Sequence, residues 1–158
     1  MTYNEYKALV EEYYETDSVL RKNEIGDKLF TALVALTKRL EKLYNKYGTH
    51  FIDDSEWRSE LGRYKLTEVA SEIAVLHYYN HWRYGGECNI NILIPTKFFD
   101  VAVRNEKEKK LKQDYISRLK VYIENNDKLI NDLKRDKSIL VEKLAKLENA
   151  EEEKSNEL

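Results

Sequence analysis

A seven-residue repeat in the C-terminal third of the chain constrains the fold more than any other feature. The repeating positions are Ile116, Ile123, Ile130, Lys137 and Leu144, with Leu119, Asn126, Leu133, Leu140 and Leu147 three residues after each of them. Apolar residues at these two heptad positions over about four repeats are typical of a coiled coil. Asn126 and Lys137 interrupt the apolar seam, and such polar residues set register or oligomeric state at some cost in stability.

The length of this helix predicts self-association. A helix over residues 97–150 would be roughly 80 Å long at ~1.5 Å per residue, whereas a compact chain of this size has a radius of gyration of only ~15 Å. It cannot be wholly buried in its own domain, so we expect a homodimer. The predicted dimerisation residues are Ile116, Leu119, Ile123, Asn126, Ile130, Leu133, Leu140, Leu144 and Leu147. A turn at residues 125–127, which would fold the helix into a hairpin, is the alternative; the unbroken repeat favours a continuous helix.

The first 60 residues predict helices. Apolar residues three and four apart indicate a helix over residues 3–15, and Thr16, Asp17 and Ser18 are N-cap candidates for the next element. A second helix has a seam of its own, made of Leu29, Leu33, Leu36, Leu40, Leu43 and Tyr47, and Gly48 ends it. This seam predicts a partner helix. Asp53 and Glu56 suggest a capping box for a short helix that ends at Gly62.

The middle of the chain alternates with a period of two, which predicts strands. Residues 73–82 and 88–94 alternate on either side of Gly85-Gly86, a pair typical of a two-residue hairpin turn. That turn would place Tyr84 opposite Glu87, Trp82 opposite Asn89 and Tyr79 opposite Ile92. Arg83 would face Cys88 and His81 would face Ile90. The isoleucines would then share one face, with Tyr78, Trp82, Tyr84 and the two asparagines, Asn89 and Asn91, on the other.

Two further elements flank the hairpin. A strand over residues 64–70, joined by a turn at Ser71-Glu72, would complete a three-stranded sheet, although residues 67–76 also fit a helical period. Pro95 should end the last strand, and Thr96 is the expected N-cap of the long helix. We therefore predict an α+β fold with N-terminal helices, a small antiparallel sheet of two or three strands and a long C-terminal coiled-coil-like helix. Its expected parts are a core over residues 1–103, the helix over 104–150 and a frayed tail over 151–158.

Composition excludes several classes of function. The chain has 158 residues, a net charge of -2 and one cysteine, Cys88. The balanced charge does not predict a nucleic-acid-binding surface, and a single cysteine excludes an intramolecular disulfide. The start, MTYNEYKALVEE, lacks the basic and apolar pattern of a secretory signal, and no run of 18 apolar residues occurs. We expect a cytoplasmic protein.

Catalytic and metal chemistry find little support in the sequence. His77 and His81 would lie about 13 Å apart on one strand, too far to share a zinc ion. Cys88 and His81 could form a nucleophile and base on adjacent strands, but a lone cysteine is more often a small buried residue. No phosphate-binding, dinucleotide-binding or hydrolase motif occurs. We expect no enzymatic activity, no cofactor and no metal.

The aromatic cluster at the hairpin is the candidate partner-binding site. It contributes Tyr78, Trp82, Arg83 and Tyr84, and Trp, Tyr and Arg dominate binding hot spots. Core packing is the competing interpretation. Twelve tyrosines against four phenylalanines favour exposure, because rings needed only for burial would have little use for hydroxyls. Binding of single-stranded nucleic acid by these rings and a basic run over residues 104–120 is the alternative function.

Residues 82–100, WRYGGECNINILIPTKFFD, resemble a recurring pattern in small accessory proteins of bacteriophages and mobile elements. The pattern is an aromatic strand, Tyr-Gly-Gly, a second strand, Ile-Pro and a helix; it covers roughly an eighth of the chain and brings no functional residues with it. The resemblance implies a small protein in the cytoplasm of a host cell that acts by binding. Inhibitors of host defence, such as anti-CRISPR proteins, are among such proteins. The expected function is therefore a dimeric, non-enzymatic protein-binding module that inhibits a host defence component.

Overall fold

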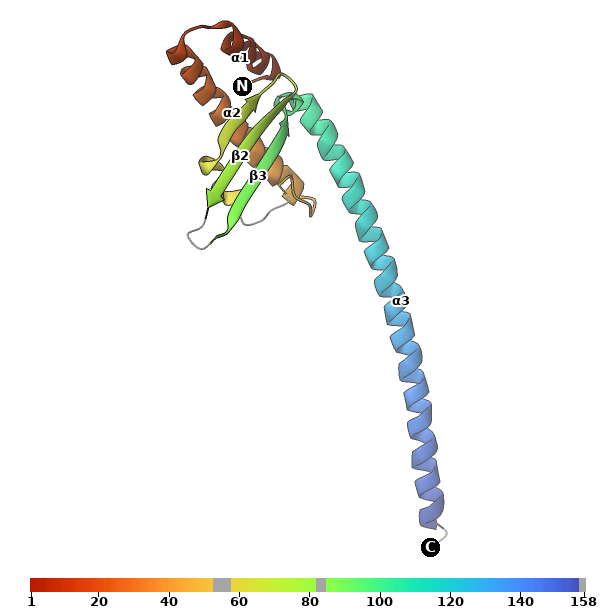
Figure 1. The fold of residues 1–158 in the computed structure, drawn as a ribbon. Coiled ribbons are helices and arrows are strands. Elements are labelled where there is room, and N and C mark those ends of the chain that lie inside the picture. The colour runs from red at the N-terminus through yellow and green to blue at the C-terminus, as the bar shows by residue number, and fades with distance from the viewer. Residues whose placement is uncertain (53–57, 82–84, 157–158) are drawn as a thin grey trace. The chain divides into compact units, whose positions relative to one another are not determined.

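The structure, a computed structural model, describes residues 1–52, 58–81 and 85–156 (Figure 1). The chain divides into two compact units, Met1–Gln113 and Asp114–Leu158, which are described separately below. The elements are helices α1 (Tyr3–Glu15) and α2 (Val19–Asn45), the 3-10 turn η1 (Arg58–Arg63), strands β1 (Lys65–Val69), β2 (Ile73–His81) and β3 (Glu87–Pro95), the 3-10 turn η2 (Thr96–Phe99) and helix α3 (Val101–Asn156). The predicted α+β fold is confirmed.

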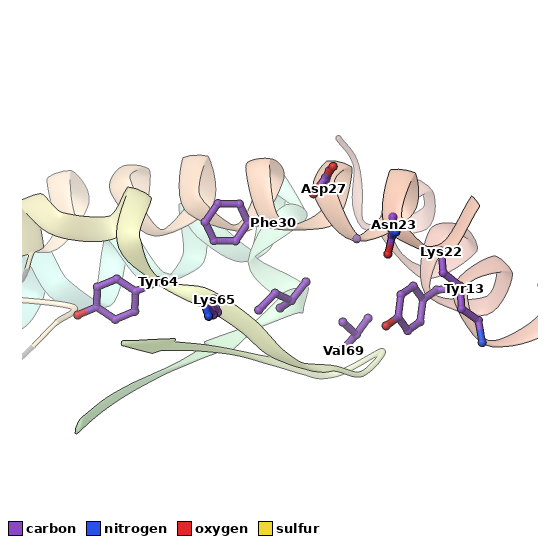
Figure 2. Close-up of a pocket in the computed structure, with 10 residues that line it drawn as sticks. Tyr13, Lys22, Asn23, Asp27, Phe30, Tyr64, Lys65 and Val69 are labelled. Carbon is purple, nitrogen blue, oxygen red and sulfur yellow. The ribbon is translucent and has the colours of Figure 1, made fainter. Parts of the chain in front are cut away.

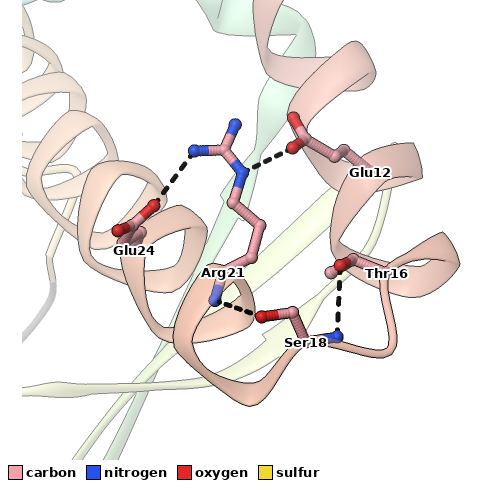
Figure 3. Close-up of polar contacts among 5 residues, drawn as sticks. All are labelled: Glu12, Thr16, Ser18, Arg21 and Glu24. Carbon is pink, nitrogen blue, oxygen red and sulfur yellow. Dashed lines mark hydrogen bonds and ion pairs between the residues drawn. The ribbon is translucent and has the colours of Figure 1, made fainter.

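Helices α1 and α2 both begin at capped ends. Thr2 and Glu5 form a capping box at the start of α1, in which each side chain accepts a hydrogen bond from the other residue's backbone N–H. Ser18, one of the expected candidates, caps α2 by accepting from the N–H of Arg21 at 3.3 Å. Figure 3 shows how Arg21 also joins the two helices, with its guanidinium 2.6 Å from Glu12 and 3.1 Å from Glu24. Because these three side chains are exposed, the ion pairs help to orient α1 against α2 but contribute little to the free energy of unfolding.

The apolar side of α2 is buried against both the sheet and α1. Its buried residues are Ile25, Leu29, Leu33, Leu36, Thr37 and Leu40. They share one core with α1, through Tyr6 and Val10, and with the inner face of the sheet, through Leu76 and Ile94. The partner helix expected from the seam is α1, and the sheet, which Figure 1 shows alongside α2, covers the same side of α2 with it.

The end of α2 is held by a carboxylate and a glycine. Gly48 has a φ of 65°, the left-handed conformation that glycine adopts at low cost, so its predicted role as a helix stop is confirmed. The Glu41 carboxylate accepts hydrogen bonds from the N–H groups of Phe51 and Ile52, both at 2.9 Å, and lies 3.0 Å from the His50 ring. This contact draws the chain back onto α2. The capping box expected at Asp53 and Glu56 lies outside the described residues.

The sheet is a three-stranded antiparallel meander in the order β1-β2-β3. The predicted turn at Ser71-Glu72 joins β1 to β2, and the helical alternative for residues 67–76 is wrong. Alternate residues of β2, Ala74, Leu76 and Tyr78, are buried against the helices, which is the pattern of a half-covered strand. A bulge between Leu66 and Glu68 interrupts the pairing of β1.

Helix α3 begins four residues later than predicted. Thr96 is not its N-cap: the residue is buried, and its hydroxyl donates to the carbonyl of Ser71. Asp100 caps α3 instead, because its carboxylate accepts from the N–H of Ala102 at 2.7 Å and its carbonyl from the N–H of Arg104 at 3.2 Å. The Thr96 hydroxyl faces inward because it donates to the Ser71 carbonyl in the β1–β2 turn, instead of accepting from an N–H at the start of α3.

From Val101 to Asn156, α3 is one uninterrupted helix. The turn considered at residues 125–127 is excluded, and residues 151–156, expected to be frayed, are helical. At ~1.5 Å per residue the 56 residues extend roughly 84 Å.

The first turns of α3 belong to the globular unit. Leu111 is buried, and the Glu108 carboxylate lies 2.7 Å from the Lys46 ammonium and accepts a hydrogen bond from the Tyr47 hydroxyl at 2.9 Å. Arg104 donates to the carbonyl of Phe98. Beyond Gln113 the helix forms the second unit by itself.

Candidate functional site

The hairpin that carries the aromatic cluster pairs in a different register from the predicted one. His81 lies opposite Glu87, Tyr79 opposite Asn89, and Tyr78 opposite Ile90. The connection thus comprises residues 82–86 rather than the two glycines alone, and Gly85, at a φ of 90°, is part of it. The pairing predicted from a Gly-Gly turn is wrong by an odd number of residues, which exchanges the two faces of one strand relative to the other.

Burial explains why this register is preferred. It places Ala74, Leu76 and Tyr78 on the same face as the isoleucines of β3, and this face meets α2. The predicted register would instead have put His77 on the isoleucine face, where an imidazole needs a hydrogen-bond partner that an apolar core does not offer. Of the four predicted partner-binding residues, Tyr78 is therefore corrected to a core residue, with 2% of its surface exposed. Trp82, Arg83 and Tyr84 lie outside the described residues.

Tyr78 packs into a small aromatic group at one end of the core. Its ring centroid lies 5.3 Å from that of Tyr64, and the Arg63 guanidinium lies 5.5 Å from the Tyr78 ring centroid. The core-packing interpretation of the aromatic cluster holds for this residue.

The outer face of the sheet leaves several large apolar side chains open to solvent. Leu93 is 59% exposed, Tyr79 54% and Ile73 41%, with half-buried Val75 between them. Val75 lies opposite Leu93, and Ile73 lies opposite Pro95, so these four side chains form a continuous patch across β2 and β3, while Tyr79 lies beyond the His77 and Asn91 pair. Surfaces of this kind on a small protein mark interaction sites.

A polar strip borders this patch toward the hairpin connection. The Nδ1 atom of His77 lies 2.6 Å from the Oδ1 atom of Asn91, directly across the strands, and Asn89 follows beside Tyr79. The free face expected from the sequence thus exists in the described part of the hairpin. Its members are Ile73, Val75, His77, Tyr79, Asn89, Asn91 and Leu93. The sequence placed the two asparagines on this face, but the predicted register put the four members from β2 on the opposite one.

Tyrosine hydroxyls serve the fold rather than a binding surface at several places. Tyr6 donates to the carbonyl of Ala70 at 2.8 Å, Tyr14 to that of Val69 and Tyr3 to that of Ser71 at 3.5 Å. Helix α1 thereby satisfies three consecutive carbonyls at the end of β1. Burial raises the pKa of the Tyr6 hydroxyl well above its ordinary value. The abundance of tyrosine is therefore a weaker indication of an exposed binding face than it is in the sequence alone.

An open groove of about 550 Å³ lies between α2 and β1 (Figure 2). Tyr13, Phe30, Tyr64 and Val69 line it with apolar surface, and Lys22, Asn23, Asp27 and Lys65 add polar groups. Figure 2 shows Lys22 at the Tyr13 end and Lys65 nearer Tyr64, so the two ammonium groups do not converge on one point. No local sequence signal could have located this groove, because its walls come from α1, α2 and β1.

The described part of the chain contains no cluster of metal ligands, and its register separates Cys88 from His81, the pair considered as nucleophile and base. No group of three or more His, Cys, Asp or Glu residues there could hold a metal ion. Cys88 is half-buried at the edge of the core and lies opposite Asn80, whereas His81 lies opposite Glu87. The two residues therefore belong to adjacent pairs of the ladder, whereas only alternate pairs share the face that a nucleophile and its base would need.

The predicted dimerisation residues follow one side of α3. Within the second unit, the eight apolar seam residues are all exposed. Ile116 and Leu119 are the least exposed, at 42%, and Leu147 is the most exposed, at 66%. Leu140, Leu144, Leu133, Ile130 and Ile123 fall between these limits. Asn126 and Lys137 are exposed as well.

None of the helices in the described residues has the length and apolar character needed to cross a membrane. Comparison of the chain with protein-family models, with curated proteins and with solved structures finds no match.

Proposed function

We propose that this chain is a non-enzymatic protein-binding module that acts as a homodimer, joined through α3, and presents the outer face of its sheet to a protein partner. The observation that carries the proposal is the apolar seam of α3, whose eight residues are 42–66% exposed. Exposure of so many large apolar residues in a regular heptad pattern is unfavourable in water, and association with a second copy removes them from it.

The outer face of the sheet supports a protein partner more than a nucleic acid. Its centre is apolar, through Ile73, Val75 and Leu93, and its polar strip is the uncharged pair of Asn89 and Asn91 with His77. Single-stranded nucleic acid is bound by rings surrounded by lysine and arginine, and Lys65 is the one lysine on the described strands, close to Glu68. A protein with an apolar surface of its own matches this face better.

The hairpin connection extends the same proposal. Trp82, Arg83 and Tyr84 follow β2 directly, at the end where Tyr79 lies. The resemblance of residues 82–100 to small phage proteins makes a component of a bacterial defence system, such as a CRISPR nuclease complex, the first partner to test. In that role the protein would be an inhibitor.

The nucleic-acid alternative receives less support from the basic run over residues 104–120. Arg104 donates to a carbonyl, the Lys107 ammonium lies 5.3 Å from the Tyr44 ring centroid, and Lys109 lies 4.0 Å from Glu106. These contacts engage the cations within the chain. Binding to an oligonucleotide that weakens steeply with salt would nevertheless favour this alternative.

The test of self-association uses light scattering on the full-length protein over a range of concentrations. We expect a dimer for the wild type, a monomer for Leu133→Asp and a dimer for the matched control Val121→Asp. Val121 is 57% exposed and lies on the opposite side of the heptad, so its substitution introduces the same charge without entering the seam. A monomeric wild type at every concentration would contradict the dimer.

The test of the outer face is affinity capture with the dimer. Tyr79→Ser/Leu93→Ser should lose a partner that Val19→Ser/Leu20→Ser retains, since Val19 and Leu20 are equally apolar, 72% exposed and placed on α2. Circular dichroism confirms that each variant is folded. Equal capture by both variants would remove the outer face from the proposal.

A further inference from the structure

The two polar interruptions of the α3 seam are symmetric about its centre. Asn126 lies five and a half residues before the midpoint between Asn131 and Asp132, and Lys137 lies the same distance after it. One occupies the d position and the other the a position of the heptad. Because α3 is continuous from Val101 to Asn156, this symmetry belongs to a single rigid element.

A parallel pairing of two copies would put like residues together. In a parallel, in-register coiled coil each a residue meets its own counterpart, so Lys137 would meet Lys137 of the second copy inside the seam. Asp136 of the second copy would offset part of this repulsion. Asn126 would meet Asn126, and both polar layers would be buried without any opposite charge between them.

An antiparallel pairing matches unlike residues instead. Each a residue then meets a d residue, and pairing about the midpoint places Asn126 opposite Lys137 of the second copy, where the amide oxygen can accept from the ammonium. Every other layer is apolar on both sides. The layers are Ile116 with Leu147, Leu119 with Leu144, Ile123 with Leu140, and Ile130 with Leu133.

Charges beside the seam agree with this arrangement. The nearest flanking positions bring Asp127 opposite Lys134 of the second copy, an attractive pair that occurs twice by symmetry. Leu129 would meet Asp136, and Tyr122 would meet Lys143, so these flanking contacts join no like charges. Both charged residues of the Asp127 and Lys134 pair are exposed in the isolated helix.

Register is specified as well as direction. Sliding one copy by a heptad in either direction puts Asn126 and Lys137 opposite leucine or isoleucine and removes apolar layers from the ends. Polar seam residues are known to fix register in this way, because the misaligned layers leave polar groups without partners.

We propose that α3 binds a second copy of this chain as an antiparallel coiled coil centred between Asn131 and Asp132. This inference rests on the proposed self-association and adds its direction and register. Since each globular unit precedes residue 114 of its own copy, the two units are joined to opposite ends of the paired segment. The dimer is then bivalent, with one outer sheet face at each end.

Pulsed electron paramagnetic resonance on full-length protein tests the direction. Cys88→Ser removes the single native thiol, and a spin label is placed on Ser117→Cys or on Asn131→Cys, both on the solvent side of the heptad. The antiparallel dimer predicts a short distance between labels at position 131 and an axial separation of roughly 44 Å at position 117, from ~1.5 Å per residue.

The other outcomes separate the two proposals. Short distances at both positions would establish a parallel dimer and overturn the antiparallel inference, while self-association would stand. Absence of dipolar coupling at both positions would overturn self-association and the inference together. A long distance at 131 would overturn the register.

A charge substitution gives an independent test. Asn126→Asp places a carboxylate opposite Lys137 twice in the antiparallel dimer and should lower the dissociation constant roughly fivefold. Asn125→Asp makes the same change one residue earlier, outside the seam, and serves as the matched control. Weaker association of Asn126→Asp than of this control is expected for a parallel dimer, where the two introduced carboxylates would face each other, and would overturn the inference.

Discussion

Residues 1–113 bury their regularly spaced apolar side chains within one chain, whereas residues 114–156 leave theirs exposed. The first unit covers α2 with a sheet and with α1, so that Leu29, Leu33 and Leu40 are fully buried within one chain. The second unit repeats apolar residues just as regularly but offers them only one helix. The same seven-residue spacing therefore stabilises a monomeric core in α2 and favours a second molecule in α3.

Removal of a core side chain should have the largest effect and should act on the first unit alone. Leu33→Ala is expected to cost about 2–5 kcal/mol, because Leu33 is fully buried and its neighbours cannot close the cavity completely. Urea denaturation followed by tyrosine fluorescence measures the loss. The loss in the free energy of unfolding should be the same at high and low protein concentration, because this core forms within one chain. A loss that depends on concentration would mean that the core of the first unit depends on a second copy.

A smaller loss is expected where a polar side chain organises the end of α2. Glu41→Ala removes the acceptor of the Phe51 and Ile52 N–H groups and should cost about 1–3 kcal/mol, since these donors are partly buried. The same denaturation experiment on Glu24→Ala, whose carboxylate is largely exposed, provides the control. Equal losses for the two variants would show that Glu41 does not hold the segment after α2.

The smallest effect concerns the attachment of α3 to the first unit, and it depends on pH. The hydrogen bond from Lys46, followed by that from Tyr47, holds the pKa of Glu108 below its ordinary value of 4.5. The ionised carboxylate therefore stabilises the folded state above pH 4.5, and this contribution disappears as the pH falls through the lowered pKa.

Thermal unfolding of wild type and Glu108→Gln measures this contribution. We expect wild type to have the higher Tm at about pH 7, by a small margin because the pair is exposed, and the margin to shrink as the pH is lowered below 4.5 and through the lowered pKa of Glu108. Glu106→Gln, two residues away and on an exposed part of the same turn, should show no comparable change. If the difference in Tm between wild type and Glu108→Gln did not change with pH, the stabilisation would not come from the charge of Glu108.

The sequence predicts elements of this protein better than it predicts their pairing. The helix start at Tyr3, the cap at Ser18, the stop at Gly48 and the turn at Ser71-Glu72 are local signals, and the structure confirms them. The hairpin register depends on which face meets α2, which no local pattern contains. Gly85-Gly86 resembles a two-residue turn so closely that the preference of Tyr78 for the core could not be recognised beforehand.

The candidate site follows the same division. The seam of α3 was found residue by residue because heptad periodicity is written in the sequence itself. The outer face of the sheet was expected to exist, but Tyr79 replaces the predicted Tyr78 on it once the register changes. Asp100 was missed as a helix cap because Thr96, next to Pro95, is an equally good residue type for that position.

The three tyrosine hydroxyls that α1 places on the carbonyls of residues 69–71 bear on the order of events during synthesis. Helix α1 leaves the ribosome some fifty residues before β1. The donors are then already present when the β1–β2 turn emerges, so its carbonyls need not wait for a later segment.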